Sequence, residues 1–145
     1  LGINEDEFVD ILHLRQKTLN MSHLHSMVQG VEAILAAYDF NRVVLHTKDY
    51  ALFYGKRLND HIEAGLEFAN LLAATRARIG KDGNLRDVRD TSCLPDSQQG
   101  ITFQQQSQNS VMNRDLVVSP AKYLPNPACT IGLGDTFVAG FQICF

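Results

Sequence analysis

Apolar residues early in the chain recur at the spacing of two amphipathic helices. The first helix is expected just after Asn4, within the acidic run of residues 4–7, because an Asn cap accepts amide hydrogen bonds and carboxylates favour the positive helix end. Ser22 is the expected cap of the second helix, whose apolar stripe is the most regular in the sequence. The stripe consists of Leu24, Met27, Val28, Val31 and Leu35.

Strand-like runs follow these two helices. Residues 42–47 and 50–54 are rich in β-branched and aromatic side chains, and they predict two neighbouring strands. Residues 60–79 return to a helical pattern, and Gly80 is the expected stop. This order of helices and strands predicts an α/β fold. The apolar side of the third helix carries Ile62, Leu66, Ala69 and Leu72, and small residues such as Ala73, Ala74 and Ala77 are expected to pack closely.

The second half of the chain is less regular. Residues 92–113 are polar and rich in glutamine, and they are expected to form a loop or an excursion from the domain. Strand character resumes at residues 116–118, before the proline-marked segment 120–127. Thr130 and Ile131 then predict the end of a strand that leads through a glycine turn into a final helix.

Composition narrows the classes of function. The 145 residues are 45% hydrophobic, which fits one globular domain, and the net charge of -3 argues against a generic nucleic-acid binder. No stretch approaches the roughly 20 apolar residues that span a bilayer, so membrane insertion is not expected. The three cysteines are widely separated, which fits reduced thiols and a cytoplasmic location.

Both ends of the sequence indicate a piece of a longer protein. It opens with Leu1 rather than Met, and residues 138–145 read as a helix still in progress. Part of any active site is therefore expected in the remainder of the polypeptide.

Residues 130–141 hold the sharpest chemical feature, which is a glycine turn at the start of a helix. Gly132, Leu133 and Gly134 allow the backbone to approach an anion, and the helix amides that follow point toward negative charge. Asp135 is placed to take the proton of an attacking hydroxyl while a phosphoryl group is transferred. Taken alone, the motif also fits a tight turn with an Asp that caps a helix.

The longer string from Gly134 to Phe141 resembles the carboxy-terminal signature of the ribokinase superfamily. Within that superfamily it is most similar to the ADP-dependent glucokinase and phosphofructokinase family. Three further segments carry the resemblance: residues 4–7 resemble an Asn-x-x-Glu element, residues 46–50 resemble a His-Thr-x-x-Tyr segment, and Asn126 with Pro127 resembles the approach to the nucleotide pocket.

The resemblance implies roles for individual residues. Asp135 is the implied catalytic base, and the turn of residues 132–134 holds the transferring phosphoryl group. Glu7 with Asn4 orders magnesium through water, whereas without the resemblance the two residues read as a helix cap. The residues implied at the nucleotide are Tyr50 beside the adenine, His46, Leu124 as an apolar wall, and Asn126; without the resemblance, Tyr50 starts a strand and His46 fills the core.

The implied fold is a ribokinase-like sheet flanked by helices, of which residues 1–145 form the carboxy-terminal part of the nucleotide-binding domain. The sugar-binding lid lies outside this chain, so the chain alone is expected to be inactive. The implied reaction transfers the β-phosphoryl group of ADP, with Mg²⁺, to glucose or fructose 6-phosphate and releases AMP. The alternatives are an ATP-dependent carbohydrate or nucleoside kinase of the same superfamily, a non-catalytic nucleotide-binding or assembly module, and a structural α/β domain with an accidental motif.

Overall fold

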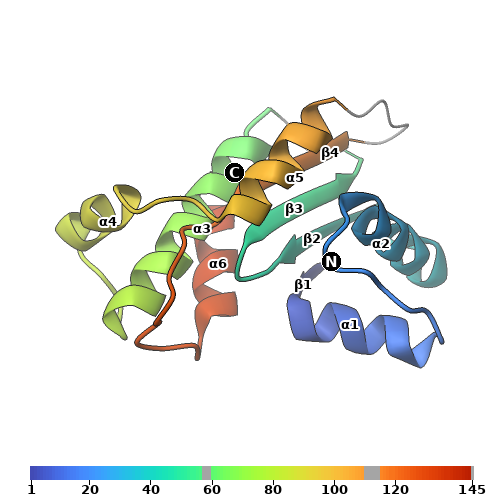
Figure 1. Cartoon of the computed structure of the whole chain (residues 1–145), viewed down its shortest axis with the longest axis horizontal. Helices are drawn as coiled ribbons and strands as arrows, with labels where there is room; N and C mark the ends of the chain where they lie inside the picture. Colours follow the sequence, from blue (N-terminus) through green and yellow to red (C-terminus); the bar gives the residue numbers. More distant parts are fainter. Residues whose placement is uncertain (57–59, 110–114, 145) are drawn as a thin grey trace.

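The computed structural model describes residues 1–56, 60–109 and 115–144, and these form one mixed sheet with helices on both faces (Figure 1). Strand β1 pairs in parallel with β2, while β2 with β3 and β3 with β4 pair antiparallel. The strands, in their order across the sheet, are β1 (Gly2–Asn4), β2 (Arg42–His46), β3 (Tyr50–Gly55) and β4 (Asp115–Pro120).

Strand β3 is the most deeply buried strand, with every residue of its apolar run in the interior. Its side chains alternate between the two faces, because successive residues of a strand point in opposite directions. A hydroxyl fixes the turn from β2: Thr47 Oγ1 accepts hydrogen bonds from the amides of Asp49 and Tyr50 at 3.2 and 3.1 Å. The same hydroxyl donates to the Tyr50 carbonyl at 3.0 Å, so the hairpin closes tightly.

One face of the sheet is covered by α1 (Glu5–Leu14), α2 (Leu24–Tyr38) and α5 (Gln98–Gln108). The apolar stripe of the second helix is buried here, as are Phe8 and Leu12 of the first, which confirms both helix predictions. The second helix is preceded by His23 rather than Ser22 as its cap residue, one position later than expected.

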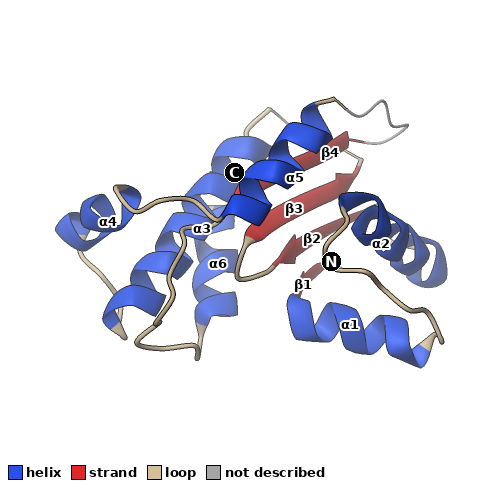
Figure 2. Ribbon diagram, in the orientation of Figure 1, coloured by secondary structure: helices blue, strands red, loops and turns tan. Residues whose placement is uncertain are grey.

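The opposite face is covered by α3 (Ile62–Ile79) and α6 (Leu133–Gln142), which pack side by side (Figure 2). Helix α3 ends at Gly80, whose φ of 76° is a left-handed conformation that glycine adopts without strain. Helix α4 (Leu85–Ser92) packs against α3 at the edge of the domain.

Three further local predictions were wrong. Residues 98–108, expected to be loop, form helix α5, because glutamine is a good helix former and Phe103 provides a buried anchor. Residues 110–113 of that expected loop lie outside the described residues. Thr130 and Ile131 belong to an irregular segment rather than to a strand. The last helix ends at Gln142, and Phe145 lies outside the described residues.

Across the described ranges, none of the helices combines the length and apolar character needed to cross a membrane. Cys93, Cys129 and Cys144 are free thiols.

Candidate functional site

The amino end of α6 is open to a ligand. Gly132 precedes the helix with φ 72° and ψ 14°, and its carbonyl accepts hydrogen bonds from the Thr136 amide at 3.2 Å and the Thr136 hydroxyl at 2.9 Å. Among the described residues no side chain caps this end, as is also the case for α2, α3 and α5, whereas Asn4 caps α1 and Asn84 caps α4. The first amides of α6 therefore keep donors available, and the helix dipole favours an anion there.

A cavity of about 350 Å³ lies against this helix start, and both Leu133 and Gly134 line it. The parallel strand pair explains the position of the cavity. Asn4 and His46 are register partners at the carboxyl ends of β1 and β2, and both of them line the cavity as well. Ligands of open α/β sheets bind outside the carboxyl ends of such strands.

One wall of the cavity is apolar and shaped by small side chains. Ala73 and Ala77 lie one turn apart on α3, so they face the same side of the helix. Leu124 and Pro127, from the segment after β4, also line the cavity. A wall of alanine methyl groups opposite aliphatic and proline side chains suits a flat ring.

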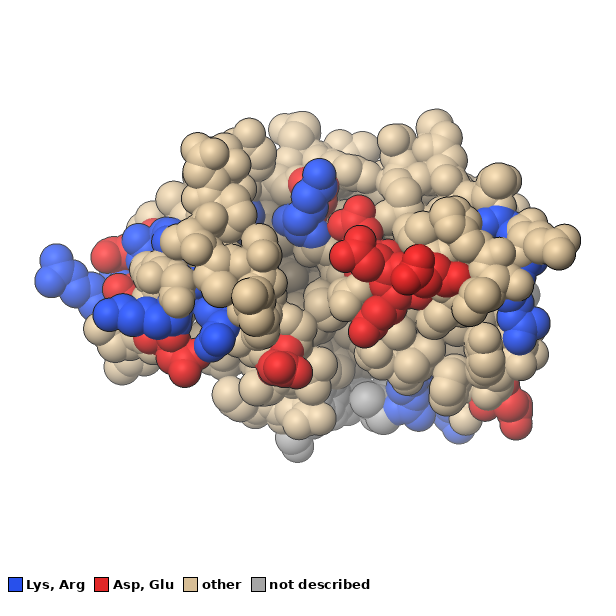
Figure 3. All heavy atoms as spheres, turned by 90° about the horizontal axis from the view of Figure 1, so that it is seen from below, with Lys and Arg blue, Asp and Glu red and all other residues tan. Residues whose placement is uncertain are grey.

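The rim of the cavity carries both signs of charge. Glu5 and Asp6 contribute carboxylates from the start of α1, and Lys48 and Lys122 contribute ammonium groups. Lys122 Nζ is held by Asp96 at 2.8 Å, whereas Lys48 is exposed. Figure 3 shows acidic side chains gathered along one side of a hollow that has basic side chains at its edge.

Asn4 and Glu7 form a reciprocal cap at the start of α1. The Glu7 amide donates to Asn4 Oδ1 at 2.9 Å, and the Asn4 amide donates to Glu7 Oε2 at 2.9 Å. Within residues 1–56, 60–109 and 115–144, no group of three His, Cys, Asp or Glu side chains is placed to hold a metal ion. The Asn4 and Glu7 side-chain oxygens already accept these two amide hydrogen bonds. They would therefore suit a magnesium ion held through its waters better than one bound directly by the protein.

His46, one of the predicted nucleotide residues, lies beside Gly134 of the glycine turn. Its ring stacks on Phe137 with centroids 4.7 Å apart, and a Cβ at Gly134 would lie 3.5 Å from its Cε1 atom. Burial lowers the pKa of His46, and the Glu7 carboxylate partly opposes that effect. The residue therefore presents a largely neutral imidazole near neutral pH.

Five predicted site residues lie outside the cavity lining: Glu7, Tyr50, Asn126, Gly132 and Asp135. Glu7 is exposed and takes part in the cap of α1, and Gly132 immediately precedes the lining residue Leu133. The side chain of Tyr50 is 2% exposed and packs on Phe103, with ring centroids 5.0 Å apart, so the expected stacking on a base does not fit this position. Asn126 is exposed between the lining residues Leu124 and Pro127. Asp135 is exposed in the first turn of α6, next to the lining residue Gly134.

Asn70 and the α3 alanines are cavity residues that the sequence did not reveal. The amide of Asn70 is 6% exposed and donates to the carbonyls of Ser119 at 3.0 Å and Pro120 at 3.2 Å. This pairing fixes α3 against the end of β4 beside the cavity. A polar Asn among the apolar positions of α3 was an available signal, whereas alanines read as packing residues.

Comparison with known proteins gives a consistent match along the chain. A sequence model of the "ADP-specific Phosphofructokinase/Glucokinase conserved region" matches residues 1–142. The ADP-specific phosphofructokinase of Pyrococcus furiosus is 26% identical over 97% of this chain, and the ADP-dependent glucose/glucosamine kinase of Pyrococcus abyssi is 24% identical over 99% of it. The chain covers 34% and 36% of these two proteins, so it spans about a third of their length.

Solved structures give the same picture. A phosphofructokinase from Pyrococcus horikoshii OT3 with AMP has a TM-score of 0.77 and 27% identity, and the match covers 99% of this chain and 35% of that one. An ADP-dependent kinase in complex with fructose-6-phosphate and ADPβS has a TM-score of 0.76 at 22% identity, which shows a likeness of fold alone, and the match covers 99% of this chain and 38% of that one. The expected α/β class, a sheet flanked by helices, is confirmed.

Proposed function

Because the chain belongs to the ADP-specific phosphofructokinase/glucokinase family, we propose that it forms the carboxy-terminal part of the nucleotide-binding domain of an ADP-dependent sugar kinase. The whole enzyme transfers the β-phosphoryl group of ADP to glucose or fructose 6-phosphate. The observation that carries this proposal is the uncapped start of α6, whose residues Leu133 and Gly134 line the cavity.

The nucleotide occupies the cavity with its base against the apolar wall and its phosphates toward α6. Ala73, Ala77 and Leu124 supply the wall, and the amides that follow Gly132 supply donors for phosphate oxygens. The P. horikoshii relative, described as a phosphofructokinase with AMP, supports nucleotide binding by this fold. His46 stacks on Phe137 and lies beside Gly134, so it supports the glycine turn from within the cavity lining.

Asp135 is the base in this proposal. As the sugar oxygen bonds to the β-phosphorus, the bond between the β-phosphorus and the bridging oxygen breaks, and AMP leaves with that oxygen. The carboxylate of Asp135 takes the hydroxyl proton during this step. Its exposed position beside Gly134 leaves it accessible to a sugar held by the remainder of the polypeptide.

Magnesium bound with the nucleotide neutralises charge on the phosphates, which is the chemistry it supplies in phosphoryl transfer. Asn4 and Glu7 stabilise the start of α1, where the carboxylates of Glu5 and Asp6 line the cavity and would hold a hydrated magnesium ion through its waters. The three free thiols suit the reducing conditions of the cytoplasm, where we place the enzyme.

The substitution Asp135→Asn in the full-length protein tests the proposed base. It preserves the shape of the side chain but removes its basicity, so kcat is expected to fall by about a hundredfold to ten-thousandfold. Binding of ADP, measured by calorimetry, is expected to change by less than about threefold. Asp10→Asn is the control, because Asp10 is exposed on α1 away from the cavity lining. Turnover of the Asp135 variant at the wild-type rate would contradict the assignment.

A further inference from the structure

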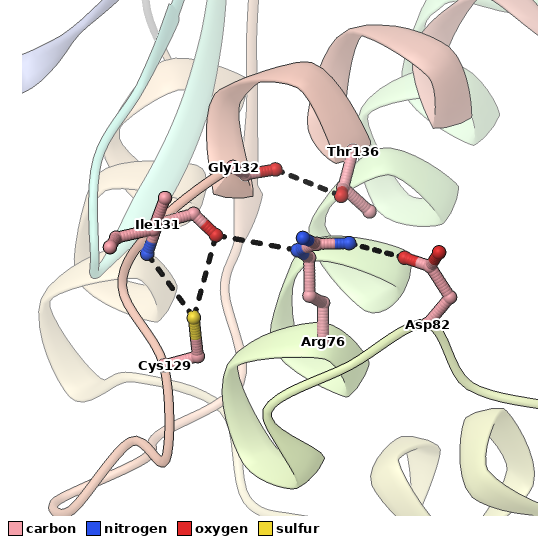
Figure 4. Close-up of polar contacts among 6 residues, drawn as sticks. All are labelled: Arg76, Asp82, Cys129, Ile131, Gly132 and Thr136. Atoms are coloured by element: carbon pink, nitrogen blue, oxygen red, sulfur yellow. Dashed lines mark hydrogen bonds and ion pairs between the residues drawn. The ribbon is translucent and has the colours of Figure 1, made fainter.

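Arg76 reaches from α3 to the segment that precedes α6. Its Nε atom donates to the Ile131 carbonyl at 3.3 Å, and its guanidinium also forms an ion pair with Asp82. Figure 4 shows the guanidinium between the Ile131 carbonyl on one side and the Asp82 carboxylate on the other. The planar group is therefore held at two points, and its direction is fixed relative to the turn.

The same guanidinium lies directly against Gly132. A Cβ placed on Gly132 would be 3.1 Å from Nη2 and 3.4 Å from both Cζ and Nε of Arg76. A side chain at this position would push the guanidinium back by a few tenths of an ångström, and the φ of 72° itself favours glycine. Gly132, the left-handed residue that precedes α6, therefore lies in close contact with the Arg76 guanidinium.

A second group of contacts joins the same segment to α3. The Ala77 carbonyl accepts hydrogen bonds from the amides of Ala128 at 2.7 Å and Cys129 at 3.2 Å. The Cys129 thiol lies on the other side of Ile131, 3.4 Å from its nitrogen and 3.5 Å from its oxygen. Two adjacent residues of α3, Arg76 and Ala77, therefore fix the path of the chain into the turn.

We propose that Arg76, oriented by Asp82, is a positioning residue that aims the amides at the start of α6. This inference rests on the proposed function, because those amides matter through the phosphoryl group they receive. Arg76 is not among the residues that line the cavity, so it acts through the Ile131 carbonyl and Gly132. The side chain of Asp82 is 88% exposed, and an ion pair this exposed contributes little to stability, so orientation is its main effect.

Arg76→Met in the full-length protein is the test, since methionine keeps an apolar stem and removes every donor. Arg78→Met is the matched control on the same helix. Arg78 makes a comparable set of contacts, but to α4: its Nε donates to Thr91 Oγ1 at 2.9 Å and its Nη2 to the Asp87 carbonyl at 2.9 Å. The two variants therefore lose similar numbers of donors, and only one loses contact with the turn.

The variants are expected to differ in catalysis and in local protection. In Arg76→Met, kcat falls by about tenfold to a hundredfold, because small displacements of positioning groups are costly in rate. The dissociation constant of AMP, which lacks the transferred phosphoryl group, stays within about twofold. Amide hydrogen exchange of residues 131–135, followed by mass spectrometry, becomes faster than in the wild type. Arg78→Met keeps wild-type values for all three quantities, and Arg76→Lys, which keeps the positive charge on a single donor nitrogen, recovers part of kcat.

Three results would overturn the inference. An equal loss of kcat in both arginine variants would give Arg76 only a structural role. A loss of AMP and ADP affinity with unchanged exchange would make Arg76 a ligand of the nucleotide. Unchanged amide exchange of residues 131–135 in Arg76→Met would show that Arg76 does not hold the turn in place. If the wild-type protein transfers no phosphoryl group from ADP, the proposed function fails, and the exchange comparison still decides whether Arg76 positions the turn.

Discussion

His46 lies half-buried between Phe137 and the glycine turn, and its surroundings disfavour a charged imidazole. Burial lowers its pKa from the ordinary value of 6.5, against the weaker opposing effect of the Glu7 carboxylate. The unfolded chain therefore binds a proton at this residue more readily than the folded chain does. The stability contributed by the neutral ring is complete above pH 6.5 and is lost as the pH falls through the lower, folded-state pKa.

His46→Phe is expected to remove this pH dependence, because phenylalanine retains the stacking on Phe137 but cannot titrate. The free energy of unfolding of the full-length protein, measured with urea, should fall more steeply from pH 7.5 to pH 5.5 in the wild type than in the variant. A constant difference between the two proteins over that interval would show that His46 titrates alike in the folded and unfolded chains.

At the level of residues, the sequence predicted the part of the candidate site that the backbone itself forms. The turn of residues 132–134 carries its requirement for glycine in the sequence, and the structure places it beside His46 and Leu124 around one cavity. The contact of Arg76 with this turn could not be predicted from the sequence. Its role depends on the approach of α3 to a segment more than 50 residues later, which no local pattern encodes.

At the level of elements, one helix bears on two expectations. Residues 98–108 were expected to be loop, and the resemblance to a family placed Tyr50 beside the adenine. Helix α5 instead places Phe103 on Tyr50, and its Gly100 allows close contact, since a Cβ there would lie 2.4 Å from the Asp49 carbonyl oxygen. The apolar periodicity of α2 and the buried run of β3 were strong enough to be predicted, whereas α5 depends on a single buried aromatic residue and was not.

The distance between α3 and α6 is set by Gly140. A Cβ at this position would lie 2.9 Å from the Ala69 Cα and 3.4 Å from the Ala69 nitrogen, so Gly140→Ala forces the two helices apart. The variant is expected to lose about 1–3 kcal/mol of unfolding free energy, measured by urea denaturation. Gly2→Ala is the control, because nothing lies within 4 Å of the added methyl group. Equal stability of the two variants would mean that α6 shifts without strain.

At the level of the whole molecule, the sheet brings three separate parts of the sequence to one end. Asn4 and His46 end the parallel strands, and α6 begins beside them. The order of helices and strands predicted the α/β class, whereas the meeting of these segments was expected only through the resemblance to a family, because the pairing of β1 with β2 spans some 40 residues. The chain covers about a third of its relatives, and we propose that the sugar site lies in the remainder of the polypeptide.

The proposal that the whole protein is an ADP-dependent sugar kinase is tested by the identity of its phosphoryl donor. Full-length protein would be incubated with Mg²⁺, either ADP or ATP, and either glucose or fructose 6-phosphate, and the nucleotide and sugar products would be separated and quantified. We expect equal amounts of AMP and phosphorylated sugar from ADP, with much slower transfer from ATP. Rapid formation of ADP from ATP, with no AMP from ADP, would contradict it.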